Sequence, residues 1–259
     1  AIAQAAYTPK DGDEWARVGS SGTAERAVRY LEEQKDRFWL YGDKPFLQMP
    51  TIAKAKTQNF GAVLPNVATG NTTVLMESQI EREITDAEKA LLVVFLTSFA
   101  LGGKKTDNSV ALSAGYTGKT NEEGKPLTGK PGPSLGFLGY LHSFLCGASL
   151  FETIWLNLIT NDRINEVPQF ASGVGIPPWE RMPEGENCAV AKELKQSLMG
   201  RFVPMCRFVL FSEEGIHYSE GVAHPTYKEG GFDLSIAVNF SAEPKAIWTD
   251  PERRPWRQL

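Results

Sequence analysis

Cys206-Arg207-Phe208-Val209-Leu210-Phe211 is followed, across Ser212-Glu213-Glu214, by a second run from Gly215 to Gly221. Aromatic and β-branched residues fill both runs, and the polar residues between them are typical of a turn. The stretch therefore predicts a β-hairpin. Residues Phe232–Phe240 alternate between apolar and polar side chains and predict a third strand. Strands are thus expected mainly in the last quarter of the chain.

Helical signals dominate the part of the chain before the hairpin. Two capping boxes, Thr85-Asp86-Ala87-Glu88 and Ser149-Leu150-Phe151-Glu152, precede apolar runs. In such a box the hydroxyl accepts from the backbone N–H three residues on, while the Glu reaches back. Helices followed by strands predict an α+β mixture. The elements expected outside the hairpin are helices over Ala24–Trp39 with Thr23 as cap, Ala90–Leu101, Leu150–Leu158 and Ala189–Leu198, and a buried strand over Leu135–Phe144.

The composition is that of an ordinary globular protein. The 259 residues are 42% hydrophobic and 22% charged, which permits a packed core in one large or two small domains. No apolar run reaches the ~18–20 residues that span a bilayer. Neither a signal peptide nor a membrane partner is expected. Three widely spaced cysteines favour a reducing, cytoplasmic location over a disulfide framework.

The net charge of −4 argues against nucleic-acid binding through bulk electrostatics. A local basic patch remains compatible with this charge, because affinity follows the charges close to the phosphates. One such patch is the segment Lys104–Pro133, which is rich in Lys and Gly. It is too polar for a core and too long for an ordinary connection, so it is either functional or a solvated insertion.

Enzyme signatures are absent from the sequence. There is no GxSxG, Walker or GxGxxG motif. His217, Glu220 and His224 are the best metal-binding set, but their spacing matches no recognised ligand pattern. Cys146 follows an apolar residue and is expected to be a buried, inert thiol. We therefore expect no catalytic residue, cofactor or metal, with a metal-dependent hydrolase as the minor alternative.

Six segments, taken in order along the chain, resemble one known family. The family is CasA, the large subunit of the type I-E CRISPR surveillance complex Cascade. The resemblance covers nearly the whole chain, although family members are longer, and both ends of this sequence look cut. It implies that residues 1–259 are part of a CasA-like N-terminal domain: an irregular α+β domain with several helices and a small antiparallel sheet, without the C-terminal helical bundle. The segments are Phe38–Gln48, Ala68–Leu75, Ser98–Gly103, Leu150–Leu158, Pro178-Trp179-Glu180 and Ile247–Arg257.

The resemblance also implies a function that is not enzymatic. Family members recognise a short flanking motif, the PAM, in double-stranded target DNA. They help to open the duplex for pairing with the guide RNA and recruit a helicase–nuclease. Protein thus reads shape and PAM, while base pairing reads the sequence. The implied partners are other Cascade subunits, the 5′ region of the guide RNA, target DNA and the helicase–nuclease. A purely structural assembly subunit is the alternative.

Family members read the PAM from the minor groove with a glycine-bearing loop and a lysine finger. The resemblance implies that the loop follows the helix end at Gly103 and so lies within residues 104–133. Small residues are expected at its centre, because a groove ~6 Å wide admits backbone only where side chains are minimal. This chain lacks the run of consecutive glycines found in other members, and it also lacks the cysteine cluster that holds zinc in some. The candidates are Ser113, Ala114 and Gly115 for the loop, with Asn108 as an alternative centre, Lys104, Lys105 and Lys119 for phosphates, and Lys228 for the finger.

Two further segments are implied to contact the guide or other subunits. Each has a simpler interpretation: a plain turn for the first, and Trp/Arg stacking within the fold for the second. A glutamine wedge that pries the duplex is expected beyond Leu259. The candidates are Gly70, Asn71 and Thr72 for a loop near the 5′ end of the guide, and Trp248, Arg253, Arg254, Trp256 and Arg257 for an interface.

Overall fold

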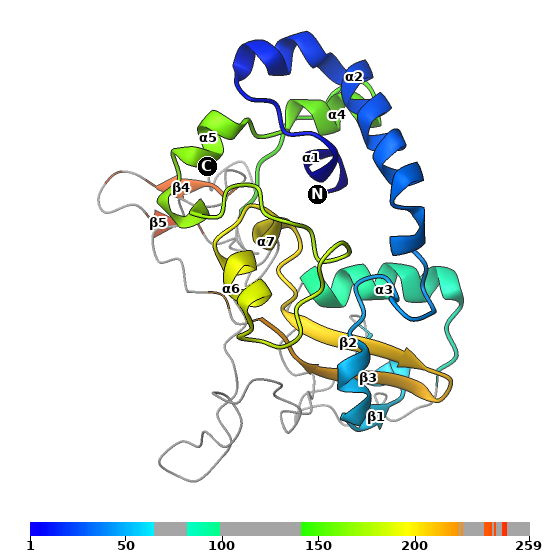
Figure 1. Cartoon of the computed structure of the whole chain (residues 1–259). Helices are drawn as coiled ribbons and strands as arrows, with labels where there is room; N and C mark the ends of the chain where they lie inside the picture. Colours follow the sequence, from blue (N-terminus) through cyan, green and yellow to red (C-terminus); the bar gives the residue numbers. More distant parts are fainter. Residues whose placement is uncertain are drawn as a thin grey trace, which may run out of the picture.

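A computed structural model describes residues 1–64, 82–98, 141–222, 224, 236–239, 241 and 245–247 of the chain. In these parts, a small three-stranded sheet lies at one end with α3 (Asp86–Ser98) packed against it. The helices α1 (Ile2–Ala6), α2 (Gly12–Glu33) and α4 (Leu150–Leu156) are grouped at the opposite end (Figure 1). The predicted α+β class, with several helices and a small antiparallel sheet, is confirmed. None of the described helices is both long and apolar enough to cross a bilayer.

The predicted hairpin is present as β2 (Arg207–Ser212) and β3 (Gly215–Glu220), which pair antiparallel. The third strand of its sheet is β1 (Thr57–Gln58), which pairs with the other edge of β3. The strand predicted over residues 232–240 is confirmed only in part, because residues 232–235 and 240 lie outside the described parts of the chain. Within that range, β4 (Val238–Asn239) pairs with β5 (Lys245–Ala246) in a separate two-stranded sheet.

The main core lies between this sheet and the helices that cover it. Leu92, Val93 and Leu96 of α3 (Asp86–Ser98) are buried in one cluster with Phe208 and Val209 of β2. The box at Thr85 begins α3 as predicted: Glu88 N donates to Thr85 Oγ1 at 3.3 Å, and Thr85 N donates to the Glu88 carboxylate at 2.7 Å. The remaining covering elements are α6 (Ala189–Lys195), α7 (Met199–Phe202) and the 3₁₀ turns Pro50–Lys54 and Phe60–Ala62.

The long helix α2 (Gly12–Glu33) is bent at Gly19, whose φ of 63° lies in the left-handed region. Glycine adopts this conformation without the steric cost that a side chain would add. The predicted start at Ala24 is wrong. Asp11 caps the helix instead, and Thr23 lies inside it and donates its hydroxyl to Gly19 O at 2.8 Å. The helix ends at Glu33, and a 3₁₀ turn (Lys35–Arg37) follows.

A second capping box begins α4 (Leu150–Leu156). Ser149 Oγ accepts from Glu152 N at 3.1 Å as predicted, but the Glu152 carboxylate accepts from Ala148 N rather than from Ser149. The helix stops at Leu156 and packs beside α2 (Figure 1). The buried strand predicted up to Phe144 is not confirmed there, since Phe144 is 68% exposed.

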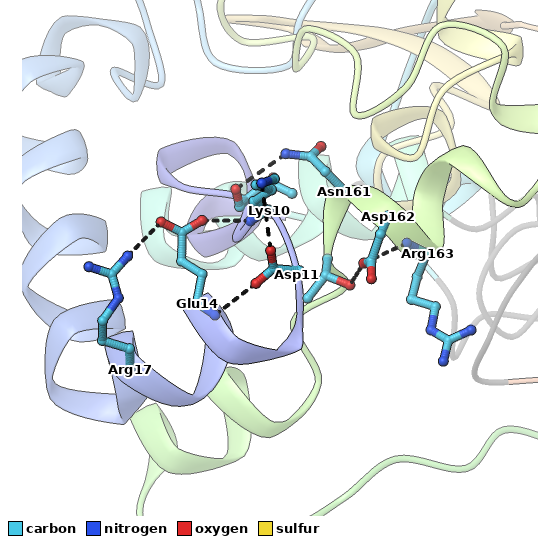
Figure 2. A network of polar contacts seen from close by, with 9 residues as sticks. Lys10, Asp11, Glu14, Arg17, Asn161, Asp162 and Arg163 are labelled. Atoms are coloured by element: carbon cyan, nitrogen blue, oxygen red, sulfur yellow. Dashed lines mark hydrogen bonds and ion pairs between the residues drawn. The ribbon is translucent and has the colours of Figure 1, made fainter.

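A polar junction joins the turn between α1 (Ile2–Ala6) and α2 to the start of α5 (Asn161–Asn165), as Figure 2 shows. Asn161 N donates to Pro9 O at 2.8 Å, and Asp162 N donates to Lys10 O at 3.1 Å. Lys10 N also donates to the Glu14 carboxylate, and this bond lowers the pKa of Glu14. The junction is closed largely by main-chain groups. A 3₁₀ turn (Pro168–Phe170) follows α5.

Candidate nucleic-acid interface

The residues predicted to touch nucleic acid or partner subunits lie outside the described parts of the chain. Their placement therefore stays a prediction, and the structure instead describes where the segments that carry them begin and end. These residues are Gly70, Asn71, Thr72, Lys104, Lys105, Asn108, Ser113, Ala114, Gly115, Lys119, Lys228, Trp248, Arg253, Arg254, Trp256 and Arg257.

Main-chain hydrogen bonds join the end of α3 to the base of the hairpin. Cys206 N donates to Thr97 O at 3.0 Å, and Gly221 N donates to Cys206 O at 3.1 Å. Val222 N then donates to Met205 O at 2.8 Å. We call these five residues the corner. The chain leaves the corner twice, after Ser98 toward the predicted glycine-bearing loop and after Val222 toward Lys228.

Close packing at the corner requires a glycine. A Cβ added to Gly221 would lie 2.1 Å from Met205 O and 2.6 Å from Arg207 N. Both are backbone atoms, so no side-chain rotation could relieve the contact. The place where the chain leaves the corner toward Lys228 is therefore held close to the place where it leaves toward the predicted glycine-bearing loop.

His224 adds a side-chain bond beside the corner. The residue is 5% exposed, and its Nε2 lies 2.7 Å from Pro204 O. A carbonyl only accepts hydrogen bonds, so the neutral imidazole carries its proton on Nε2. Burial lowers the pKa of His224 to about 4, the Pro204 bond opposes this, and the charges of Arg201 and Lys195 lower it further. The ring is therefore neutral near pH 7 and can donate steadily to Pro204.

Both segments rejoin the described fold at a second place. Leu141 N donates to Ile247 O at 3.0 Å, Ala237 N donates to Leu141 O at 2.9 Å, and Ile247 N donates to Ala237 O at 2.9 Å. His142 and Ile236 form an antiparallel bridge beside them. We call these residues the ladder. The segments containing Gly115 and Lys228 thus run from one corner to one ladder, and the segment 248–259 begins at the same ladder.

The segment with Gly70, Asn71 and Thr72 starts elsewhere. It follows Leu64, near the hairpin turn, where Gln58 pairs with Ile216 and the ring of Phe60 lies 5.9 Å from that of Phe211. It ends before α3 begins at Asp86. The corner lies at the other end of β2, and the 6 residues of β2 separate the two sites by about 20 Å.

The described residues do not form the metal site considered for the hydrolase alternative. His217 Nδ1 lies 2.7 Å from Ala55 O, on the edge where β3 meets β1, whereas His224 bonds Pro204 beyond the end of β3. Across the described parts of the chain, no group of three or more His, Cys, Asp or Glu side chains is placed to hold a metal ion. Cys146, expected to be buried, is exposed.

One residue of this region was missed as an anchor by the sequence analysis. The sequence indicated His224 only as a metal ligand, because its hydrogen-bond partner Pro204 lies 20 residues away. The one available signal was the apolar strand before it, which predicts that the following residues start inside the core.

Comparison with known proteins decides the family. The family model for CRISPR-associated protein Cse1 matches residues 1–259. The chain belongs to the Cse1 family. A curated Cse1 relative, CRISPR-associated protein CasA/Cse1 of Thermus thermophilus, is 31% identical over 100 residues, which cover 37% of this chain and 20% of that protein.

Solved Cse1 structures share the fold of this chain. Thermobifida fusca Cse1 superposes with a TM-score of 0.64 at 21% identity, covering 99% of this chain and 50% of that one. Thermus thermophilus CasA gives a TM-score of 0.54 at 20% identity, covering 99% and 49%. The chain therefore spans about half the length of these solved relatives.

Proposed function

We propose that this chain is part of the N-terminal domain of a Cascade large subunit and reads the PAM in double-stranded DNA. One observation carries the proposal. The segments holding the predicted glycine-bearing loop and the predicted lysine finger both leave the fold at the corner and both return at the ladder. Shared attachment points would favour the meeting of these two groups in one groove.

The net charge of the chain is compatible with a PAM-recognising subunit that works within a larger assembly. With a net charge of −4 it has no bulk attraction for DNA. Local contacts to phosphates and base edges would come from Lys104, Lys105, Lys119 and Lys228. Neighbouring subunits would supply the rest of the positive electrostatic potential.

We further propose that the segment after Leu64 contacts the guide RNA near its 5′ end. Its attachment near the hairpin turn lies about 20 Å from the corner, so the proposed guide-contacting and DNA-reading segments start from opposite ends of β2. The assembled subunit would help to open the duplex and recruit the helicase–nuclease in the cytoplasm, with no catalytic role of its own.

The test is duplex binding by the reconstituted ribonucleoprotein, with and without this subunit, on matched targets that differ only in the flanking trinucleotide. The subunit should tighten binding to one flank selectively, and Lys228→Ala or Gly115→Trp should reduce that selectivity at least about tenfold, since a good base contact contributes about 1–3 kcal/mol of discrimination. Lys10→Ala is the matched control, because Lys10 is an exposed lysine on the α1–α2 turn. Equal binding to all flanks in the presence of the subunit would refute PAM reading.

The alternative is a structural subunit that no longer reads DNA, favoured by the absence of a glycine run in residues 104–133. The double variant Lys104→Ala/Lys105→Ala separates the two functions. If duplex affinity and its salt dependence stay unchanged while the complex still assembles, the structural function holds.

A further inference from the structure

We draw no further inference here: the strongest candidate, the exposed apolar surface patch that Leu91 and Val94 form on the face of α3 turned away from the sheet, carries nothing because no feature of the described structure shows what covers it.

Discussion

Trp15 of α2 and Trp155 of α4 bond each other reciprocally. Each indole N–H donates to the main-chain carbonyl of the other residue, at 2.9 and 3.0 Å. Their rings stack with centroids 4.3 Å apart and planes 10° apart. No residue of α4 is fully buried, and this pair links α4 directly to α2.

Replacing one indole by a benzyl ring tests this link. Trp155→Phe keeps an aromatic ring but removes one N–H donor, so we expect a loss of about 1 kcal/mol in the free energy of unfolding. Trp155→Ala also removes the stacked ring and should lose more. Urea unfolding measures both variants; an unchanged midpoint in Trp155→Ala would show that the pair does not hold α4.

The raised pKa of Tyr30 predicts that the protein loses stability at alkaline pH. Its hydroxyl accepts from Trp179 Nε1 at 2.7 Å and donates to the Glu180 carboxylate. Burial, followed by the bond to Glu180, raises the pKa of Tyr30. The unfolded chain releases this proton near pH 10 while the folded chain keeps it, so the stabilisation is full below pH 10 and falls as pH rises above it.

The variant Tyr30→Phe isolates this effect. It should lose about 1–3 kcal/mol at pH 7, because Trp179 is buried and its N–H would be left without an acceptor. The difference from the parent should shrink between pH 9 and pH 11 in urea unfolding. A constant difference across that range would contradict the assignment.

Gly221 should not tolerate even a methyl group. An added Cβ would lie 2.1 Å from Met205 O, so Gly221→Ala must displace backbone at the corner. We expect a loss of about 1–3 kcal/mol or more. The same substitution at Gly12, where a Cβ meets nothing within 4 Å, should change stability by about 0.5 kcal/mol or less. Thermal unfolding of the pair checks this, and equal midpoints would refute the tight corner.

The lowered pKa of His224 predicts that the protein loses stability in acid. Its folded pKa of about 4 is below the ordinary value of 6.5. The unfolded chain therefore binds a proton first, so the stabilisation is full above pH 6.5 and falls as pH drops toward 4. The contribution is on the order of 3 kcal/mol. Arg201 and Lys195 oppose the imidazolium from α7 and α6.

Substitution of His224 tests this acid dependence. His224→Gln cannot titrate and should flatten the pH dependence of stability between pH 6.5 and 4.5. The carboxylates of Asp86 and Glu88, whose pKa values are lowered by their hydrogen bonds to Tyr41 and to Thr85, titrate below that window and should be unaffected. An unchanged slope between pH 6.5 and 4.5 would place the responsible proton elsewhere.

Local signals in the sequence predicted the local parts of the fold. The hairpin is formed by residues adjacent in sequence, and the boxes at Thr85 and Ser149 cap their helices with residues three positions away. Distant pairings could not be predicted in this way. The strand β1 has two residues and exists because it meets β3. The extension of α2 back to Gly12, across the bend at Gly19, was not predicted either, because glycine is unfavourable inside a helix.

The same contrast between local sequence signals and distant contacts applies to the candidate site. Its residues came from resemblance to a family, and none of them lies in the described parts of the chain. The corner and the ladder came from the structure, because hydrogen bonds between Thr97 and Cys206 or Leu141 and Ile247 leave no local pattern in the sequence. Burial of His224 likewise depends on Pro204, 20 residues earlier.

The two ends of α2 bind partners that are made long after the helix itself. Trp15 and Trp155 are 140 residues apart, and Tyr30 and Glu180 are 150 apart. The Gln48 side chain accepts from Phe211 N across 163 residues. Loop closure over such separations slows folding, and a chain leaves the ribosome at about 5–20 residues per second. During synthesis, α2 therefore waits many seconds before these partners are made, a period in which chaperones have access to it.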